Sequence, residues 1–141
     1  MLIRKLKETD YQKGLNELLS QLTHSPKGTE EDFKLQFKNL KESDLHLAIE
    51  IDNKIVAFGA ILIDYKFYRE LKNIGHIEDI VVDKDYRGQG LSKVLMNNLI
   101  EHGEKHKCYK FILNCKEEYT YFYSKYGFEN KNITMVKYCY D

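Results

Sequence analysis

The stretch Gly75-His76-Ile77-Glu78-Asp79-Ile80-Val81-Val82 runs directly into Asp83-Lys84-Asp85-Tyr86-Arg87-Gly88-Gln89-Gly90-Leu91-Ser92. The first half is an apolar run that carries two carboxylates, which predicts a strand, and the second half predicts a turn that enters a helix through Gly88 and Gly90. The first N–H groups of a helix lack partners within it, so this order of elements forms an anion site. Arg87 adds a permanently charged, planar donor to the same place.

The bulk composition restricts the classes of protein that the chain can represent. Its 141 residues fit one domain, 1–141, and its 22 basic residues equal its 22 acidic ones. We therefore expect no nucleic-acid partner, because no net field favours one. No apolar run approaches the ~18–20 residues of a membrane span, and the N-terminus lacks the pattern of a signal peptide. The expectation is a cytoplasmic protein without a membrane partner.

The cysteines indicate neither a metal site nor a disulfide framework. There are three of them, Cys108, Cys115 and Cys139, without the close paired spacing of zinc ligands. We expect reduced thiols and no metal. A covalent acyl-carrier role for Cys115 stays open as the alternative to an inert packing role.

The N-terminal part predicts a strand and two helices. Leu2–Leu6 forms the strand, and Thr9–Gln12 matches a capping box. Four leucines then mark the buried face of a first helix: Leu15, Leu18, Leu19 and Leu22. A loop at residues 23–28, which holds the single proline, ends it. A second capping box, Thr29–Asp32, opens a helix with Phe33, Phe37 and Leu40 on one face.

The remaining elements complete an α/β fold, a mixed and mostly antiparallel sheet flanked by about four helices. Alternating apolar residues predict a hairpin of strands at 45–51 and 54–63, followed by a central strand at 74–82. A helix follows Gly90, and Tyr109–Leu113 predicts a short buried strand. Aromatic residues at helical spacing predict a last helix, capped by Gly127, before a closing strand at 133–140: Tyr119, Phe122, Tyr123 and Tyr126.

The glycine loop also carries a resemblance to a known family. Arg87-Gly88-Gln89-Gly90-Leu91-Ser92 resembles the Arg/Gln-x-x-Gly-x-Gly/Ala pyrophosphate loop of the GNAT superfamily of N-acetyltransferases, with Ser92 at the small-residue position. Its place between a strand and a helix, in a chain of fitting length, makes the match specific. The resemblance implies the GNAT fold and acetyl-CoA as co-substrate. It also implies that Ile80, Val81 and Val82 belong to the cofactor-binding strand, with the main chain of Ile80 and Val82 binding the pantetheine arm.

Further segments are similar to the glucosamine-6-phosphate N-acetyltransferase family. They are Leu22-Thr23, Lys66-Phe67, Gly75–Val82, Cys108-Tyr109-Lys110, Phe122-Tyr123 and Tyr126-Gly127-Phe128. This likeness implies transfer of an acetyl group from acetyl-CoA to the amine of glucosamine 6-phosphate, by direct attack in a ternary complex. The product would feed UDP-N-acetylglucosamine synthesis. It also implies a homodimer in which the C-terminal strands meet.

The two carboxylates of the central strand have competing interpretations. Neighbours on a strand point to opposite faces, and a carboxylate within an apolar strand is costly without a partner. Glu78 and Asp79 could therefore be structural ion-pair residues. By resemblance, both line the sugar site, which would require a strand distortion or a dimer partner to reconcile their directions.

The resemblance assigns chemical roles to Tyr123 and Asn114. Packing on the aromatic helix face could explain Tyr123, but the family's Phe-Tyr pair implies a hydroxyl that reprotonates or stabilises the leaving thiolate. Asn114 stands where the family has Asp or Glu. Since an asparagine cannot take up a proton, Asn114 would orient the substrate, and the base would be Glu78, another group or a water, unless the amine arrives neutral.

The substrate phosphate needs donors, and the sequence offers three. Thr23 matches a loop threonine of the family, and Lys66 and Lys137 are candidate cations, although lone lysines are usually solvated. Two alternatives to the main interpretation stay open: an acetyltransferase for another small amine, and a non-catalytic acyl-CoA sensor, which Asn114 makes conceivable.

Overall fold

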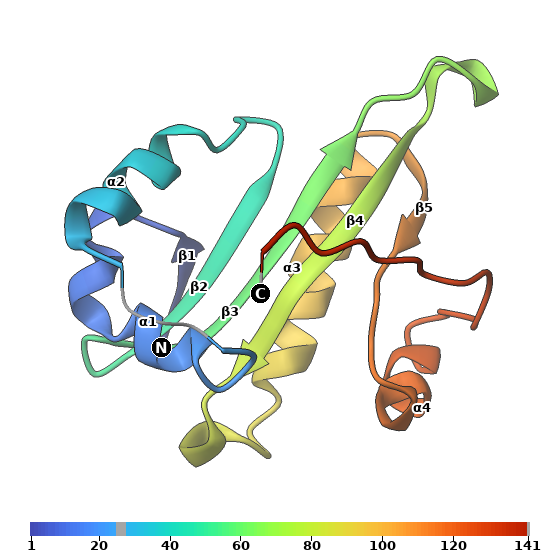
Figure 1. Ribbon diagram of the computed structural model, residues 1–141. Coiled ribbons are helices and arrows are strands. Elements are labelled where there is room, and N and C mark those ends of the chain that lie inside the picture. Colours follow the sequence, from blue (N-terminus) through green and yellow to red (C-terminus); the bar gives the residue numbers. More distant parts are fainter. Residues whose placement is uncertain (25–27, 141) are drawn as a thin grey trace.

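A five-stranded mixed sheet forms the centre of the computed structural model, which describes residues 1–24 and 28–140. The strands lie in sequence order and run Leu2–Lys5 (β1), Leu45–Ile51 (β2), Lys54–Asp64 (β3), Asn73–Val82 (β4) and Cys108–Ile112 (β5). The first four are antiparallel to their neighbours, and β5 is parallel to β4 (Figure 1). The expected mixed, mostly antiparallel sheet is confirmed.

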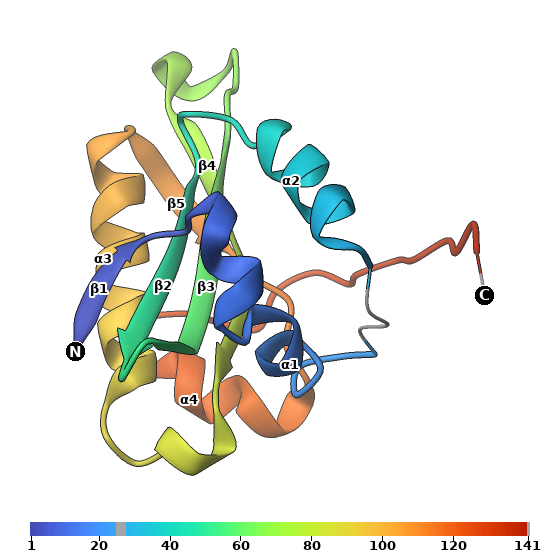
Figure 2. The same cartoon turned by 90° about the vertical axis from the view of Figure 1, so that its left-hand side faces the viewer.

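Helices cover the sheet from both sides (Figure 2). The helix Leu91–Lys105 (α3) packs on one face, where Leu91, Leu95 and Leu99 meet buried residues of β2, β3 and β4. The other face carries Leu15–Leu19 (α1) and Glu30–Lys38 (α2), with Leu15 and Leu18 over a second apolar cluster. Thr120–Ser124 (α4) follows β5, and short 3₁₀ turns lie at 8–13 (η1), 69–71 (η2), 84–86 (η3) and 117–119 (η4).

Strong local patterns produced the expected elements. Asp52 and Asn53, both with positive φ, form the tight turn of the β2–β3 hairpin, as Asn and Asp tolerate that conformation. The capping box at the start of α2 is present: Thr29 Oγ1 accepts the N–H of Asp32 at 3.0 Å, and Asp32 accepts the N–H of Thr29. Both predictions are confirmed.

The first capping box was predicted at the wrong residues. The turn η1 begins after Lys7, whose backbone N–H donates to Asp10 Oδ2 at 2.7 Å. Gly14, in a left-handed conformation, then separates η1 from the short helix α1. Leu22 lies beyond that helix and is 40% exposed, so it is not a core residue. Residues 25–27 of the predicted loop lie outside the described residues.

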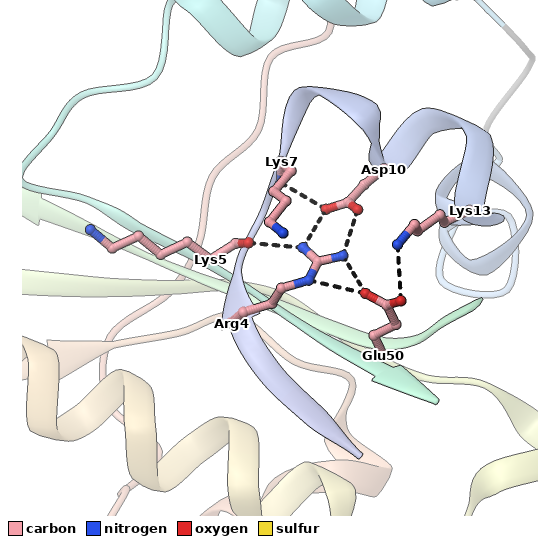
Figure 3. A network of polar contacts seen from close by, with 6 residues as sticks. All are labelled: Arg4, Lys5, Lys7, Asp10, Lys13 and Glu50. Atoms are coloured by element: carbon pink, nitrogen blue, oxygen red, sulfur yellow. Dashed lines mark hydrogen bonds and ion pairs between the residues drawn. The ribbon is translucent and has the colours of Figure 1, made fainter. Parts of the chain in front are cut away.

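An ion-pair network explains why η1 displaces the expected helix start (Figure 3). Arg4 of β1 makes two hydrogen bonds to the fully buried Asp10, at 2.7 and 2.9 Å. Arg4 also contacts Glu50 of β2 at 2.7 Å, and Lys13 reaches the other oxygen of Glu50 at 2.9 Å. Lys13 and Arg4 lower the pKa of Glu50, and its carboxylate therefore stays ionised. The network ties η1, which leads into α1, to the sheet.

The C-terminal prediction needs a correction. Residues 129–140 form no strand but an extended segment that leaves the body of the molecule on the side of α1 and α2 (Figures 1 and 2). Its apolar side chains are exposed, among them Ile133 at 88% and Met135 at 92%. A strand forms only with a paired neighbour, and within the described chain this segment has none. For the same reason β5, an edge strand, is half-buried rather than fully buried.

No helix among residues 1–24 and 28–140 has the length and apolar character that a membrane crossing requires.

Candidate active site

A bulge in β4 determines where its two carboxylates lie. Phe58 pairs with Val81 and Ala60 pairs with Glu78, so β4 advances three residues while β3 advances two. Asp79 adopts φ 57°, a left-handed conformation that Asp tolerates better than most residues. Ile77 and Ile80 both pack beneath α3, although residues three apart on a regular strand face opposite sides. The bulge thus keeps Asp79 out of that core, and its side chain is exposed.

Glu78 lies on the sheet face opposite α3 with a perturbed carboxyl group. Burial, followed by the charge of Asp79, raises its pKa, and His76 opposes the rise. Ala60 lies beside Glu78 in the β3–β4 register and beside His46 in the β2–β3 register. His46 therefore lies on the same sheet face, one strand beyond Ala60, and burial lowers the pKa of its imidazole. A carboxylate with a raised pKa is a better proton acceptor than an ordinary surface glutamate.

The edge of β4 beyond His76 is open to a ligand. The β4–β5 pairing runs from Asn73↔Cys108 to His76↔Ile112, and in the described sheet no residue from Ile77 to Val82 pairs with β5. Main-chain groups on that edge, including those of Ile80, are therefore placed to hydrogen-bond an extended chain. The carbonyl of Val82 accepts from Arg87 Nε at 3.3 Å. Arg87 is thus held against the end of the same strand.

The loop after β4 brings the uncapped start of α3 into the open. Buried Asp83 fixes the turn by accepting the N–H of Asp85 at 2.9 Å and pairing with Lys54 at 3.3 Å. Gly88 and Gly90 have φ of 80° and 78°, and an added Cβ at either would meet no protein atom within 4 Å. Gly90 is the N-cap, and no side chain caps α3. The first N–H groups of the helix consequently face open space, as anion binding requires.

A cavity of about 1040 Å³ lies between β5, α4 and the C-terminal segment. Asn114, Cys115 and Tyr123 line it, together with Lys110, Tyr126 and residues 127–134. Tyr123 is held by edge contacts with the rings of Phe122 and Phe128. Burial raises the pKa of Tyr123, and Cys115, Tyr119 and Tyr126 add to the rise. Its phenol is therefore neutral and can donate a proton.

The structure divides the sequence-predicted residues into groups. Tyr123 and Asn114 share the cavity, whereas Glu78, Asp79 and the loop 87–92 do not line it. The loop 83–90 and α4 lie at the same end of the sheet (Figures 1 and 2). The oxygen of Asn114 accepts a hydrogen bond from Thr134 at 2.7 Å. Cys115, the open alternative for an acyl carrier, is exposed beside them.

The predicted phosphate donors are not gathered by the described chain into one place. Lys66 pairs with Asp64 at 2.9 Å, and Asp64 also contacts His76 at 3.4 Å. Lys137 is exposed on the C-terminal segment, and Thr23 is exposed after α1. The sequence named Lys110 only as part of a segment similar to the family, and it did not name Lys131; both are cations of the cavity lining. The alternation of β2 could have placed His46 on the same sheet face as Glu78, but nothing local indicated a cavity role for the lysines.

The resemblance of the glycine loop implied the GNAT fold, and comparisons with known proteins confirm it. The acetyltransferase (GNAT) family model matches residues 11–128. A glucosamine 6-phosphate N-acetyltransferase from Arabidopsis thaliana is 42% identical over 96% of this chain and 95% of that protein. One from Oryza sativa subsp. japonica is 40% identical over 96% of this chain and 86% of that protein. The crystal structure of glucosamine-6-phosphate N-acetyltransferase from A. thaliana matches with a TM-score of 0.93, at 40% identity, and covers 98% of this chain and 97% of that one. The chain therefore belongs to the GNAT family and, within it, to the glucosamine 6-phosphate N-acetyltransferase family.

Proposed function

We propose that the chain is a glucosamine-6-phosphate N-acetyltransferase, which moves the acetyl group of acetyl-CoA to the amine of D-glucosamine 6-phosphate in a ternary complex. The observation that carries this proposal is the near full-length match, at 40–42% identity, to relatives that bear this name. Residues 1–141 would act as one acetyltransferase domain. The product, N-acetylglucosamine 6-phosphate, would enter UDP-N-acetylglucosamine synthesis in the cytoplasm.

The β4 edge and the following loop fit acetyl-CoA. Gly88 and Gly90 leave open space before an uncapped helix, which suits a pyrophosphate, and Arg87 supplies a cation. Gln89, Leu91 and Ser92 add main-chain groups to the same loop. The unpaired edge from Ile80 to Val82 suits an amide-bearing arm. When bound, acetyl-CoA supplies the thioester carbonyl that the amine attacks.

Glu78 is the proposed general base. An amine must lose its proton before or during attack on a carbonyl, and Glu78 has the raised pKa that proton acceptance favours. A water can relay the proton if the amine lies beyond direct reach. Asp79, exposed next to Glu78 on the bulge, would bind sugar hydroxyls or the amine. These roles explain two carboxylates in an otherwise apolar strand.

Tyr123 is the proposed acid for the leaving thiolate. A phenol with the ordinary pKa of ~10 is protonated near neutral pH, and burial keeps Tyr123 so. It can therefore stabilise the leaving thiolate by a hydrogen bond and give it a proton. Asn114 cannot accept a proton and would orient the substrate through its amide. Thr23, Lys66 and Lys137 are the proposed phosphate donors, with the charge of Lys66 shared with Asp64.

We further propose a homodimer formed through the C-terminal segment. Ile133, Met135 and Tyr138 are each more than four-fifths exposed, although apolar side chains of this size usually find cover. A large cavity separates this segment from the edge strand β5. A second copy of the segment would supply the missing strand partner, and it would bring the partner's Lys137 toward this site.

Release of the CoA thiol with a panel of amines tests the proposal. Glucosamine 6-phosphate should give a kcat/KM at least tenfold above glucosamine, polyamines and amino acids. Preference for a polyamine or an amino acid would replace the proposed substrate by another small amine. Tight acetyl-CoA binding without release for any amine would instead favour the acyl-CoA sensor.

A further inference from the structure

The contact between Asn114 and Thr134 is the basis of a new inference. Thr134 Oγ1 donates to Asn114 Oδ1 at 2.7 Å, across 20 residues of sequence. Asn114 follows the end of β5, and Thr134 lies within the extended C-terminal segment, residues 129–140. Among residues 1–24 and 28–140, this is the one hydrogen bond or ion pair that joins the segment to the rest of the molecule, because the pair Lys131–Glu129 is internal to it.

The contact lies where the segment leaves the molecule. Asn114 lies two residues beyond the end of β5, and Thr134 lies five residues into the segment that begins at residue 129. Ile133 and Thr134 line the cavity together with Asn114. A hydrogen bond at Thr134 is therefore well placed to hold the first half of the segment beside the cavity.

The same contact defines what Asn114 has left to offer a substrate. Its oxygen is engaged by Thr134, and its NH₂ group, a donor only, remains for the cavity that Asn114 lines. Asn114 is thus better suited to holding a second group than to receiving a proton from an amine. The hydroxyl of Thr134 needs only an acceptor at position 114, and a carboxylate there would serve equally well.

We propose that Asn114 is a positioning residue that acts through Thr134: it fixes where the C-terminal segment leaves the molecule and holds the segment beside the cavity. This inference rests on the proposed function, in which the segment forms the dimer and carries Lys137 to the substrate phosphate. We call the hydrogen bond between Thr134 and Asn114 the latch. Loss of the latch loosens the segment and weakens substrate binding, while the proton transfers at Glu78 and Tyr123 continue.

Thr134→Val, which removes the hydroxyl at constant shape, is the first test. In the proposed dimer, strand pairing protects the amides of residues 130–137, and loss of the Thr134 contact should accelerate their hydrogen exchange about three- to tenfold, the range expected for loss of one hydrogen bond. KM for glucosamine 6-phosphate should rise over the same range, with kcat within about twofold. Thr134→Ser should restore both, and Thr9→Val, at an exposed threonine far along the chain, should change neither. Unchanged exchange in Thr134→Val, or no rescue by serine, overturns the proposal.

Substitutions at Asn114 test the other half of the contact. Asn114→Asp retains an acceptor and should keep the exchange protection of the segment, whereas Asn114→Leu should lose as much protection as Thr134→Val. The double variant Asn114→Leu/Thr134→Val should exchange no faster than either single variant, because both remove one interaction. Additive acceleration would show two independent effects and overturn the latch. If the parent enzyme acetylates no amine, the proposed function fails, yet the exchange measurements still decide the latch.

Discussion

At the scale of single residues, the bulge keeps both Glu78 and Asp79 out of the core beneath α3, which simple alternation along a strand does not predict. The extra residue in β4 puts Ile77 and Ile80 in the same core, so the strand changes facing at Asp79. A carboxylate pair in an apolar strand thereby avoids the core beneath α3. The cost is one left-handed residue, and strain of this kind is commonly found at functional sites.

Replacement of the proposed base should change both rate and pH dependence. We expect Glu78→Gln to lower kcat/KM by roughly 10²–10⁴-fold, the usual contribution of general base catalysis. In the parent, Glu78 must be ionised to accept a proton, and its raised pKa means that activity falls on acidification at a pH above 4.5, the ordinary value. That acidic limb should disappear in the variant. Glu101→Gln, at an exposed carboxylate of α3, is the matched control.

The prediction for Tyr123 separates chemistry from binding. Tyr123→Phe should lower kcat at least tenfold and leave the dissociation constant of acetyl-CoA within about twofold, because a proton donor acts in the transition state. Stopped assays and calorimetry measure the two quantities. Tyr121→Phe, at a 73% exposed tyrosine of the same helix, should behave as the parent. A Tyr123→Phe enzyme with parental kcat would exclude the thiolate role.

At the scale of elements, the entry into α3 uses two glycines, Gly88 and Gly90. Both have positive φ and leave open space in front of the helix, and neither is needed for close packing. Gly88→Ala should raise the dissociation constant of acetyl-CoA about tenfold or more, since the new methyl group lies where a ligand would approach and positive φ is strained for alanine by about 1 kcal/mol. Gly14→Ala provides the control: φ is 82° there, but the site lies at α1. It should cost similar stability without loss of affinity. Equal affinity losses in both variants would contradict the assignment of the loop.

The Arg4 network should determine how firmly η1 and α1 are held. Arg4→Ala leaves the carboxylate of Asp10 buried without its guanidinium, and we expect about 3 kcal/mol lower free energy of unfolding in urea. Arg4→Lys, which keeps the charge but loses the planar fork, should lose less. Lys105→Ala, which breaks the exposed pair with Glu101, should change stability by no more than about 0.5 kcal/mol.

The sequence predicted an element correctly where the interactions that form it join residues close together in the chain, and failed where they join distant residues. Caps, turns and apolar periodicity within a few residues correctly predicted α2, α3 and the β2–β3 hairpin. The start of η1 depends on Asp10, which Arg4 of β1 holds, and Arg4 is in turn paired with Glu50, 46 residues away, so the local pattern at Thr9 was misleading. The site shows the same limit. The glycine loop could be predicted from six consecutive residues, but the direction of Asp79 could be known only from the bulged pairing of β3 with β4.

At the scale of the whole molecule, the C-terminal segment was predicted as a strand because its own residues have high β propensity. A strand also needs a paired neighbour, and the described part of this chain offers none to the segment. The described chain offers β5 as an edge and the segment as an uncovered apolar surface, with a cavity between them. In the proposed dimer a second copy of the chain would satisfy both requirements at once, and this makes the state of assembly a test of the fold as well as of function.

Charges placed on the exposed apolar residues of the segment should therefore separate the subunits. We expect the parent to sediment as a dimer of 16.8 kDa chains, and the double variant Ile133→Glu/Met135→Glu to sediment as a monomer with kcat/KM reduced at least tenfold. Burying two carboxylates in an apolar contact is too costly for a stable interface. Leu35→Glu, at a 62% exposed leucine of α2, tests whether any new surface charge has this effect, and we expect it to remain a dimer. A parent that is fully active as a monomer would refute the dimer, and it would require the phosphate donors to come from within one chain.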